Sequence, residues 1–331
     1  MRAALFACIT ALGIAMPGTA AGDEALRQQA AALFGQLKAG PNPSSAQAEL
    51  GRALFWDTRA SADGKTACAS CHFARDWGAD RRKFSPDARG ALTSRHSPTV
   101  FNSMDQPGLR WLNDRKTGAD QAESSLTGSL GFATKDAATV KLRELDYLAR
   151  FRAAFPEDEQ PLSTVNYGRA LAAYQATLVT PAPFDRFLGG DDKALTERQK
   201  TGLKAFIATG CAGCHSGMNL GGSMLVKFGV TRDYWLETGS ENPDPGRFAV
   251  TKKEEDRYVF RVPMLRNVAK TAPYVHDGSV DRLDRAVRVM GIVQLGRTLD
   301  DATVGSIVSF LESLTGEVPS HYAPPGQKPV M

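Results

Sequence analysis

The stretch Cys211-Ala212-Gly213-Cys214-His215 decides the fold class, and the chain contains a second copy of it, Cys68-Ala69-Ser70-Cys71-His72. Two cysteines separated by two residues and followed at once by histidine form the attachment site of a c-type haem. The two thiols bond covalently to one edge of the porphyrin, and the histidine becomes the proximal ligand of the iron. Two copies of the stretch therefore predict two haems.

A four-thiolate zinc site is the main alternative for two Cys-x-x-Cys pairs. Such sites usually separate their pairs by tens of residues, whereas Cys68 and Cys211 are 143 positions apart. A thioredoxin-like redox pair or plain disulfides leave the histidine after each second cysteine unexplained. The haem interpretation accounts for cysteines and histidines together.

The N-terminal residues 1–21 have the composition of a secretory signal peptide. Arg2 supplies a basic start, residues 3–16 are mostly apolar, and small residues follow up to Ala21, where we expect cleavage. A lipoprotein signal using Cys8 leaves too few residues before that cysteine. Cleavage removes Cys8 and leaves four of the five cysteines, all within the two motifs. Since c-type haems are attached outside the cytoplasm, we expect a periplasmic protein without a membrane span.

Composition and charge are ordinary for a globular protein. The chain has 331 residues, 42% hydrophobic and 23% charged, which is room for about two domains. Its formal charge of +4 becomes +3 once Arg2 is removed, and haem propionates offset the remainder. Basic runs such as residues 81–83 are short and are expected to be solvated surface or propionate neighbours. Nucleic acid is therefore not an expected partner.

Hydrophobic periodicity predicts a mainly α fold with long irregular loops. One expected helix is capped near Ser44-Ser45, ends near Asp57 and leads to the first motif. Another opens with the capping sequence Thr196-Glu197-Arg198-Gln199 and leads to the second. Further helices are expected at residues 23–38, 137–155 (with Val140, Leu142, Leu145, Leu148 and Phe151 available to a core), 164–179, 281–290 and 300–314, with irregular chain over 73–135 and a short hairpin within 219–256.

Two cytochrome c-like haem domains are expected to follow the signal peptide. The first covers residues 22–185, and the second covers residues 186–331. The last helix and the tail after it are candidates to pack back on the first domain.

Ordered matches over residues 48–317 resemble the bacterial di-haem cytochrome c peroxidases and the related MauG-type enzymes. The matching stretches are residues 50–57, 97–102, 184–188, 246–248, 262–267, 271–278 and 289–291. The resemblance implies that the C-terminal domain holds the electron-transfer haem, which stores an electron at high potential with His and Met ligands. It also implies that the N-terminal domain holds the peroxidatic haem, which reduces peroxide. The matched Met is Met290 in Val289-Met290-Gly291, with Met218, Met224 and Met264 as rivals. MauG has Tyr there, so Met290 favours the peroxidase branch.

The first half departs from the family pattern at two positions. The family's distal His has no match in Asp87-Ala88-Arg89-Gly90, and its peroxide-cleaving Glu aligns with Gly131. The nearest replacements in the sequence are His96 and Glu123. Losing a proton-transfer group typically slows a reaction by about 100- to 10,000-fold. Either His96 or Glu123 therefore transfers the proton, or the protein reduces peroxide inefficiently.

His96 has three interpretations. It can bind the first haem iron, it can stand back and move the peroxide proton, or it can replace the Asn that helps the family bind calcium between the haems. We favour the acid–base role. The remaining calcium ligands of the family are backbone carbonyls, matched by Thr271 and Pro273, which allows one calcium ion.

Three further residues match functional positions of the family. Gln121 aligns with an active-site Gln, and Trp111 aligns with the Trp between the two haems. His276 aligns with a His near the second haem, where it is expected to contact a propionate or another polar group. His321, in the Pro-rich tail, is expected at the surface.

The sequence therefore predicts a periplasmic oxidoreductase that reduces hydrogen peroxide with electrons from a small soluble cytochrome c or cupredoxin. A MauG-like oxidase acting on a protein or small molecule, and a non-enzymatic di-haem electron carrier, remain the alternatives. The resemblance also allows a homodimer.

Overall fold

The computed structural model describes residues 18–331, so residues 1–17 of the expected signal peptide lie outside it. The described chain is mainly helical, as the periodicity predicts. None of its helices is both long and apolar enough to span a membrane. The first half contains α1 (Gly18–Leu33), α2 (Ala46–Trp56), η1 (Thr58–Ala60), η2 (Cys68–Ser70), η3 (Ala74–Asp76), α3 (Gly118–Ser125), α4 (Lys135–Glu144), α5 (Leu148–Ala154), α6 (Thr164–Ala176) and α7 (Pro183–Leu188).

The second half combines helices with one short two-stranded sheet. Strands β1 (Leu225–Lys227) and β2 (Val259–Arg261) pair antiparallel, with Val226 opposite Phe260. The expected hairpin within 219–256 is thus replaced by a pairing whose second strand lies beyond that range. The helices are α8 (Glu197–Thr209), η4 (Cys211–Gly213), α9 (Tyr234–Thr238), α10 (Phe248–Thr251), η5 (Glu254–Asp256), η6 (Val268–Lys270), α11 (Leu283–Leu295) and α12 (Asp301–Glu312).

Each motif follows a helix that crosses a partner helix at very close range. In the first half, α2 packs on α6, and a side chain at Gly51 would approach the Ala170 carbonyl oxygen to 2.0 Å. In the second half, α8 packs on α12, and a side chain at Gly202 would come within 1.9 Å of the Ser306 carbonyl oxygen. Glycine is therefore required at both crossings. These two helix pairs fix where each motif begins.

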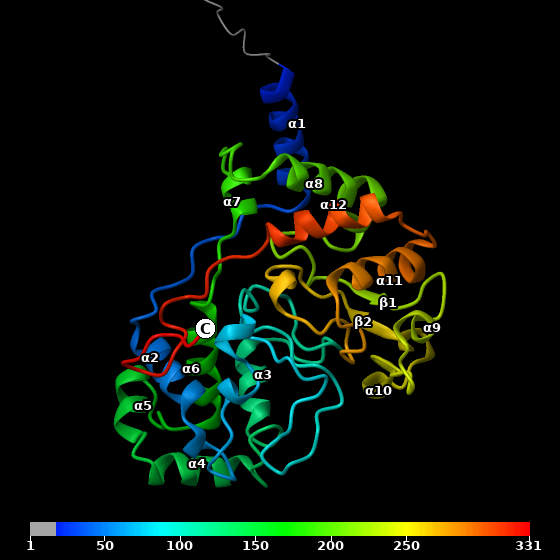
Figure 1. Ribbon diagram of the computed structural model, residues 1–331. Coiled ribbons are helices and arrows are strands. Elements are labelled where there is room, and N and C mark those ends of the chain that lie inside the picture. Colours follow the sequence, from blue (N-terminus) through cyan, green and yellow to red (C-terminus); the bar gives the residue numbers. More distant parts are fainter. Residues whose placement is uncertain (1–17) are drawn as a thin grey trace, which may run out of the picture.

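Two hydrophobic cores correspond to these helix pairs, and Figure 1 shows them as separate groups of helices. The first core contains Leu50, Leu54 and Phe55 of α2. The second core is formed by apolar side chains of α8 and α12, and it also includes Leu26 and Phe34 from the N-terminal segment. The division at residue 185 therefore places α1 in the wrong half, because its apolar face packs on the second core. The last helix also stays in the second core, whereas the tail after it returns to the first.

The expected helix over residues 137–155 is two helices. Chain direction changes after α4, where Asp146 has a φ of 59°, and α5 begins at Leu148. Val140 is 53% exposed and is not a core residue, because the buried face of α4 is formed by Ala138 and Leu142, one turn apart. The irregular region 73–135 also contains a helix, α3, which the sequence did not predict.

A buried ion pair connects the two halves of the chain near residue 185. Asp185 accepts two hydrogen bonds from the guanidinium of Arg266, at 2.6 and 2.9 Å, and the Arg266 side chain is fully buried. Burial lowers the pKa of Arg266, because water no longer stabilises its charge. Asp185 also accepts from the backbone N–H groups of Leu37 and Ala182.

Replacing Asp185 with Ala should lower the free energy of unfolding by about 3–5 kcal/mol, because the Arg266 charge then stays buried without a partner. Chemical denaturation of the haem-loaded protein measures this. Asp301→Ala is the matched control, because Asp301 pairs with Arg288 at the surface and is 94% exposed. Equal stability losses in the two variants would contradict the structural role of the buried pair.

Candidate haem sites

The first motif lies in a tight turn after η1. Cys68 begins the short helix η2, and Cys68 and Cys71 are both free thiols. The Nδ1–H of His72 donates to the Gly78 carbonyl oxygen at 2.8 Å. This bond fixes the ring and leaves Nε2 with a lone pair, which is the form of histidine that binds a metal.

The second motif has the same arrangement. Helix α8 ends at Gly210, whose φ of 99° turns the chain into η4, and Cys211 and Cys214 are free. The Nδ1–H of His215 donates to the Leu220 carbonyl oxygen at 3.2 Å. Burial lowers the pKa of His215 to about 4, so its imidazole is neutral and available to a metal at pH 7. Both motifs therefore fit covalent haem with histidine ligation.

A cavity of about 220 Å³ adjoins the second motif. Cys211, Cys214 and His215 line it, and so does Met290 of α11. Of the four candidate methionines, Met264 and Met290 line this cavity, whereas Met218 and Met224 do not. The wall is largely apolar, as a porphyrin site requires. Met290, on α11, stays the predicted sixth ligand, and Met264 remains its rival.

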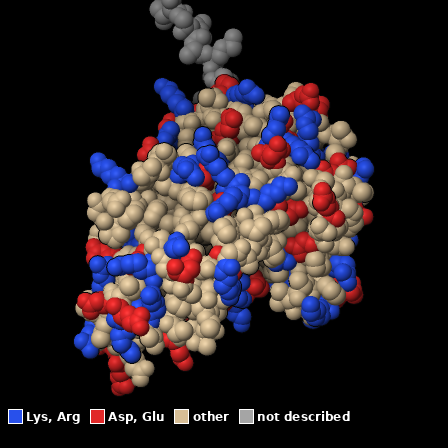
Figure 2. All heavy atoms as spheres, turned by 60° about the horizontal axis from the view of Figure 1, so that its bottom comes forward, with Lys and Arg blue, Asp and Glu red and all other residues tan. Residues whose placement is uncertain are grey.

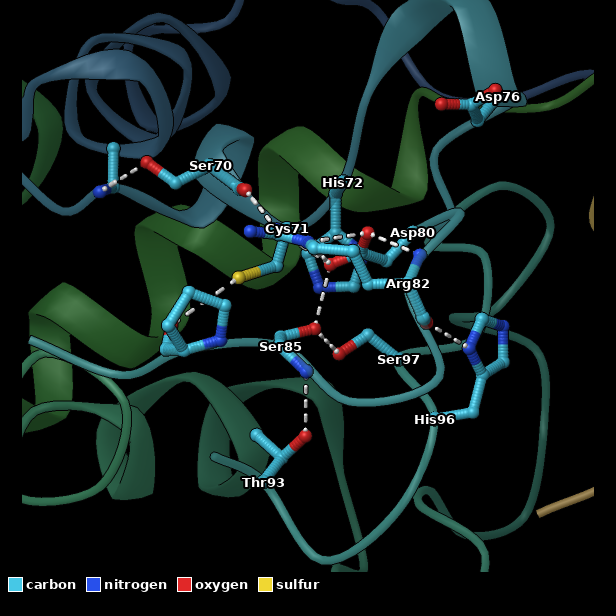
Figure 3. Close-up of polar contacts among 12 residues, drawn as sticks. Ser70, Cys71, His72, Asp76, Asp80, Arg82, Ser85, Thr93, His96 and Ser97 are labelled. Atoms are coloured by element: carbon cyan, nitrogen blue, oxygen red, sulfur yellow. Dashed lines mark hydrogen bonds and ion pairs between the residues drawn. The ribbon is translucent and has the colours of Figure 1, made fainter. Parts of the chain in front are cut away.

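His96 lines this same cavity, although the sequence placed it near the first motif. Its side chain is 4% exposed, and its Nδ1–H donates to the Arg82 carbonyl oxygen at 3.1 Å. Figure 3 shows His96 beside the polar residues that surround His72. Burial lowers the pKa of both His72 and His96 below the ordinary value. His96 therefore lies at the junction of the two sites.

Trp111 and His276 meet His96 at this junction. The Trp111 indole N–H donates to the His96 carbonyl oxygen at 2.9 Å, and the His96 backbone N–H donates to the His276 carbonyl oxygen at 2.8 Å. The Trp111 ring contacts His276 edge-on, with ring centroids 6.3 Å apart. All three residues line the cavity. The structure thus brings together three candidates that are distant in the sequence.

His276 occupies an aromatic environment. Its ring stacks on Phe260 at a centroid distance of 4.1 Å, and its Nε2 lies 3.5 Å from the Tyr234 hydroxyl. Burial lowers the pKa of His276 to about 4. The expected contact with a propionate stays a prediction.

His276 should make the protein less stable in acid. Its folded-state pKa of about 4 lies below the ordinary 6.5, so the unfolded chain binds the proton first, and stability is lost as the pH falls from about 6.5 to 4. The contribution approaches about 3 kcal/mol at pH 4. We expect His276→Phe to flatten this part of the curve of unfolding free energy against pH. If the slope between pH 6.5 and 4 is unchanged in this variant, His276 is not the source of the loss of stability in acid.

Gln121 and Glu123, both on α3, are committed to other partners. The Gln121 side-chain oxygen accepts from the Arg110 guanidinium, which also donates to Ser124 Oγ at 2.9 Å. Glu123 pairs with Lys135 at 2.7 Å, and this contact lowers the pKa of its carboxyl. Glu123 is therefore a poor proton acceptor for peroxide at neutral pH.

The backbone at Gly131, where we expect the family's Glu to align, requires glycine. Gly131 has a φ of 76°, and a Cβ there would lie 2.9 Å from the Ala88 Cβ. The turn at residues 87–90 packs directly against this position, with the Ala88 N–H donating to the Ser129 carbonyl oxygen at 2.9 Å. A glutamate at residue 131 would strain the backbone and collide with this turn. The turn at residues 87–90 contains no histidine, and residue 131 carries no carboxylate.

A polar network beside the first motif was missed by sequence reasoning (Figure 3). The Asp80 carboxylate is buried and accepts from Arg82 at 2.6 Å and from Ser85 Oγ at 2.7 Å. Burial raises the pKa of Asp80, but the hydrogen bonds from Arg82 and Ser85 outweigh this effect, so the pKa lies below its ordinary value. Arg82 also donates to the Ser70 carbonyl oxygen, within the motif, at 2.9 Å. The only signal in the sequence was the basic run at residues 81–83.

Thr271 and Pro273, the expected backbone ligands of calcium, also line the cavity. Within residues 18–331, no group of three or more His, Cys, Asp or Glu side chains could hold a metal ion. Since the family's calcium ligands are mainly carbonyl oxygens, this finding does not bear on them. Calcium binding stays a prediction.

Comparison with known proteins agrees with this arrangement. The family model described as di-haem cytochrome c peroxidase matches residues 45–193. The cytochrome c551 peroxidase of Pseudomonas aeruginosa is 42% identical over 308 residues, which cover 89% of this chain and 88% of that protein. The chain belongs to the di-haem cytochrome c peroxidase family. It is accordingly an oxidoreductase, and its family carries two haem c groups.

Other members of the family show its breadth. The cytochrome c551 peroxidase of Nitrosomonas europaea is 37% identical over 87% of this chain and 85% of its own. The methylamine utilization protein MauG of Methylophilus methylotrophus is 29% identical over 82% of each chain. A solved structure of a MauG-like protein associated with microbial copper homeostasis superposes with a TM-score of 0.75 at 27% identity, covering 88% of this chain and 96% of that one. The di-haem peroxidase branch and the MauG branch therefore share this fold.

Proposed function

We propose that this family member is a periplasmic peroxidase that reduces hydrogen peroxide to two waters with two electrons and two protons. A small cytochrome c or cupredoxin supplies the electrons one at a time. The proposal rests on a difference between the two sites. Met290 lines the cavity of His215, and a Met ligand raises the reduction potential of a haem. The second site then stores an electron, and the first receives peroxide.

Haem iron, when bound, supplies the redox chemistry at both sites. The protein supplies histidine ligands whose rings are fixed by Gly78 and Leu220, and it surrounds the second cavity with a largely apolar wall. Heterolysis of peroxide also requires a group that moves a proton between its oxygens. His96 is the proposed group, since its Nδ1–H is held by Arg82 and its Nε2 remains able to accept a proton.

The partner is proposed to be a soluble redox protein and not a nucleic acid. Lys and Arg side chains are interspersed with Asp and Glu on the face in Figure 2, so that face presents no extended basic patch. We further propose that the N-terminal signal peptide directs export and is cleaved near Ala21. We also propose that the mature protein forms a homodimer.

Steady-state peroxide consumption with a reduced cytochrome c or cupredoxin tests this function. Two equivalents of donor should be oxidised per peroxide consumed, and no peroxide should disappear catalytically without donor. A protein that neither consumes peroxide nor binds small ligands at the first haem would be an electron carrier, which would contradict the proposal.

A MauG-like oxidase is the second candidate, and the likeness of this fold to the solved structure of a MauG-like protein supports it. An oxidase of this type would use the same two haems to oxidise a protein or small-molecule partner. Peroxide-driven oxidation of such a partner, without oxidation of the cytochrome or cupredoxin, would favour it over the peroxidase.

A further inference from the structure

The C-terminal tail, residues 313–331, leaves the second core after α12 and returns to the first. Figure 1 places the C-terminus beside α2 and α6, the helices that support the first motif. Tyr322 is fully buried there and is a member of the first hydrophobic core. The end of the chain thus completes a site whose other residues lie more than 100 positions earlier.

Hydrogen bonds tether the tail along its length. The Trp77 indole donates to the Gly316 carbonyl oxygen at 2.8 Å, and Arg52 Nε donates to the Ala323 carbonyl oxygen at 2.7 Å. His321 Nε2 lies 2.8 Å from the Thr177 hydroxyl, so His321 is half-buried and is not the free surface residue that the sequence suggested. The tail is therefore part of the folded first half.

Tyr322 touches the predicted haem ligand directly. Its hydroxyl donates to the backbone carbonyl oxygen of His72 at 2.7 Å. Its ring is held edge-on by Phe101, with centroids 4.6 Å apart, and by Trp56 at 5.3 Å. A ring fixed on two sides leaves the hydroxyl little freedom, so its bond specifies where the His72 backbone lies.

His72 is consequently fixed at two points. The bond from its own Nδ1 to Gly78 sets the rotation of the imidazole, and the bond from Tyr322 sets the backbone from which the imidazole extends. Groups that orient a metal ligand in this way also tune the metal. We propose that Tyr322 is a positioning residue of the first haem site, and that the C-terminal tail sets the orientation of His72 and hence the properties of that haem alone.

The test compares the two haems within one molecule. Tyr322→Phe removes only the hydroxyl, and we expect it to shift the midpoint potential of the first haem and to change the shares of its low-spin and high-spin signals. The second haem should keep its potential and spectrum, because Tyr322 packs in the first core. These readouts need neither peroxide nor an electron-donor protein, so they can fail or succeed independently of the proposed peroxidase activity.

Tyr147→Phe is the matched control. Tyr147 is buried in the same core, and its hydroxyl donates to Asp57 at 2.9 Å without touching His72. It should lower the thermal midpoint without moving either potential. A first-haem potential that is the same in Tyr322→Phe as in the unaltered protein, or that moves as far in Tyr147→Phe, would overturn the proposal.

A second variant addresses the tail as a whole. Arg52→Ala removes the tether at Ala323 and leaves Tyr322 in the sequence. We expect faster hydrogen exchange in residues 319–331 together with a smaller shift of the same first-haem potential. Exchange that increases without any change in that potential would show that the tail does not position His72.

Discussion

Replacing Met290 with Ala is expected to abolish the low-spin thioether signature of the second haem and to lower its midpoint potential. The physical reason is that a thioether stabilises reduced iron, and Met290 is the α11 methionine that lines the cavity of His215. A truncation in a core normally changes stability, by about 2–5 kcal/mol for Met, and not a redox potential. Electronic spectra during a redox titration measure the effect.

Met264→Ala is the control for this prediction, because Met264 lines the same cavity from a segment outside the helices. It should leave the thioether signature unchanged. If Met264→Ala abolishes the signature and Met290→Ala does not, the ligand is Met264 and the assignment is wrong.

Replacing His96 with Ala is expected to leave both haems attached and to reduce peroxide turnover by about 100-fold or more, because the proton-transfer group is lost. Stopped-flow measurement of the reaction with peroxide gives the rate. A change of the first haem from low to high spin would instead show that His96 had been its ligand.

His96→Asn separates catalysis from structure. Asparagine restores the residue type that the family uses near calcium and can still donate a hydrogen bond to the Arg82 carbonyl oxygen, but it cannot carry a proton at neutral pH. Turnover should therefore stay as low as in His96→Ala. Recovery in His96→Asn would assign His96 a purely structural role.

Local signals in the sequence predicted the elements that hold the motifs. Ser45 and Thr196 cap α2 and α8 as expected, with the Ala48 and Gln199 N–H groups donating to their hydroxyls. Asp300 likewise caps α12. Such caps depend on residues within one turn of each other, so a sequence pattern contains all the information needed.

Long-range packing could not be predicted in this way. The apolar pattern of α1 does not indicate whether the helix packs on the first or the second core. Likewise, nothing near Tyr322 in the sequence indicates that its hydroxyl reaches His72. The meeting of His96, Trp111 and His276 was not predicted, because it depends on bonds between segments up to 180 residues apart. The break at Asp146 was hidden by apolar residues that continue the helical period on both sides.

The intact mass of the purified, exported protein tests the central claim most directly. The account predicts the mass of the polypeptide without its signal peptide plus two covalently attached haems, one at Cys68 and Cys71 and one at Cys211 and Cys214. A mass showing one haem, or an unmodified polypeptide that binds zinc, would contradict it.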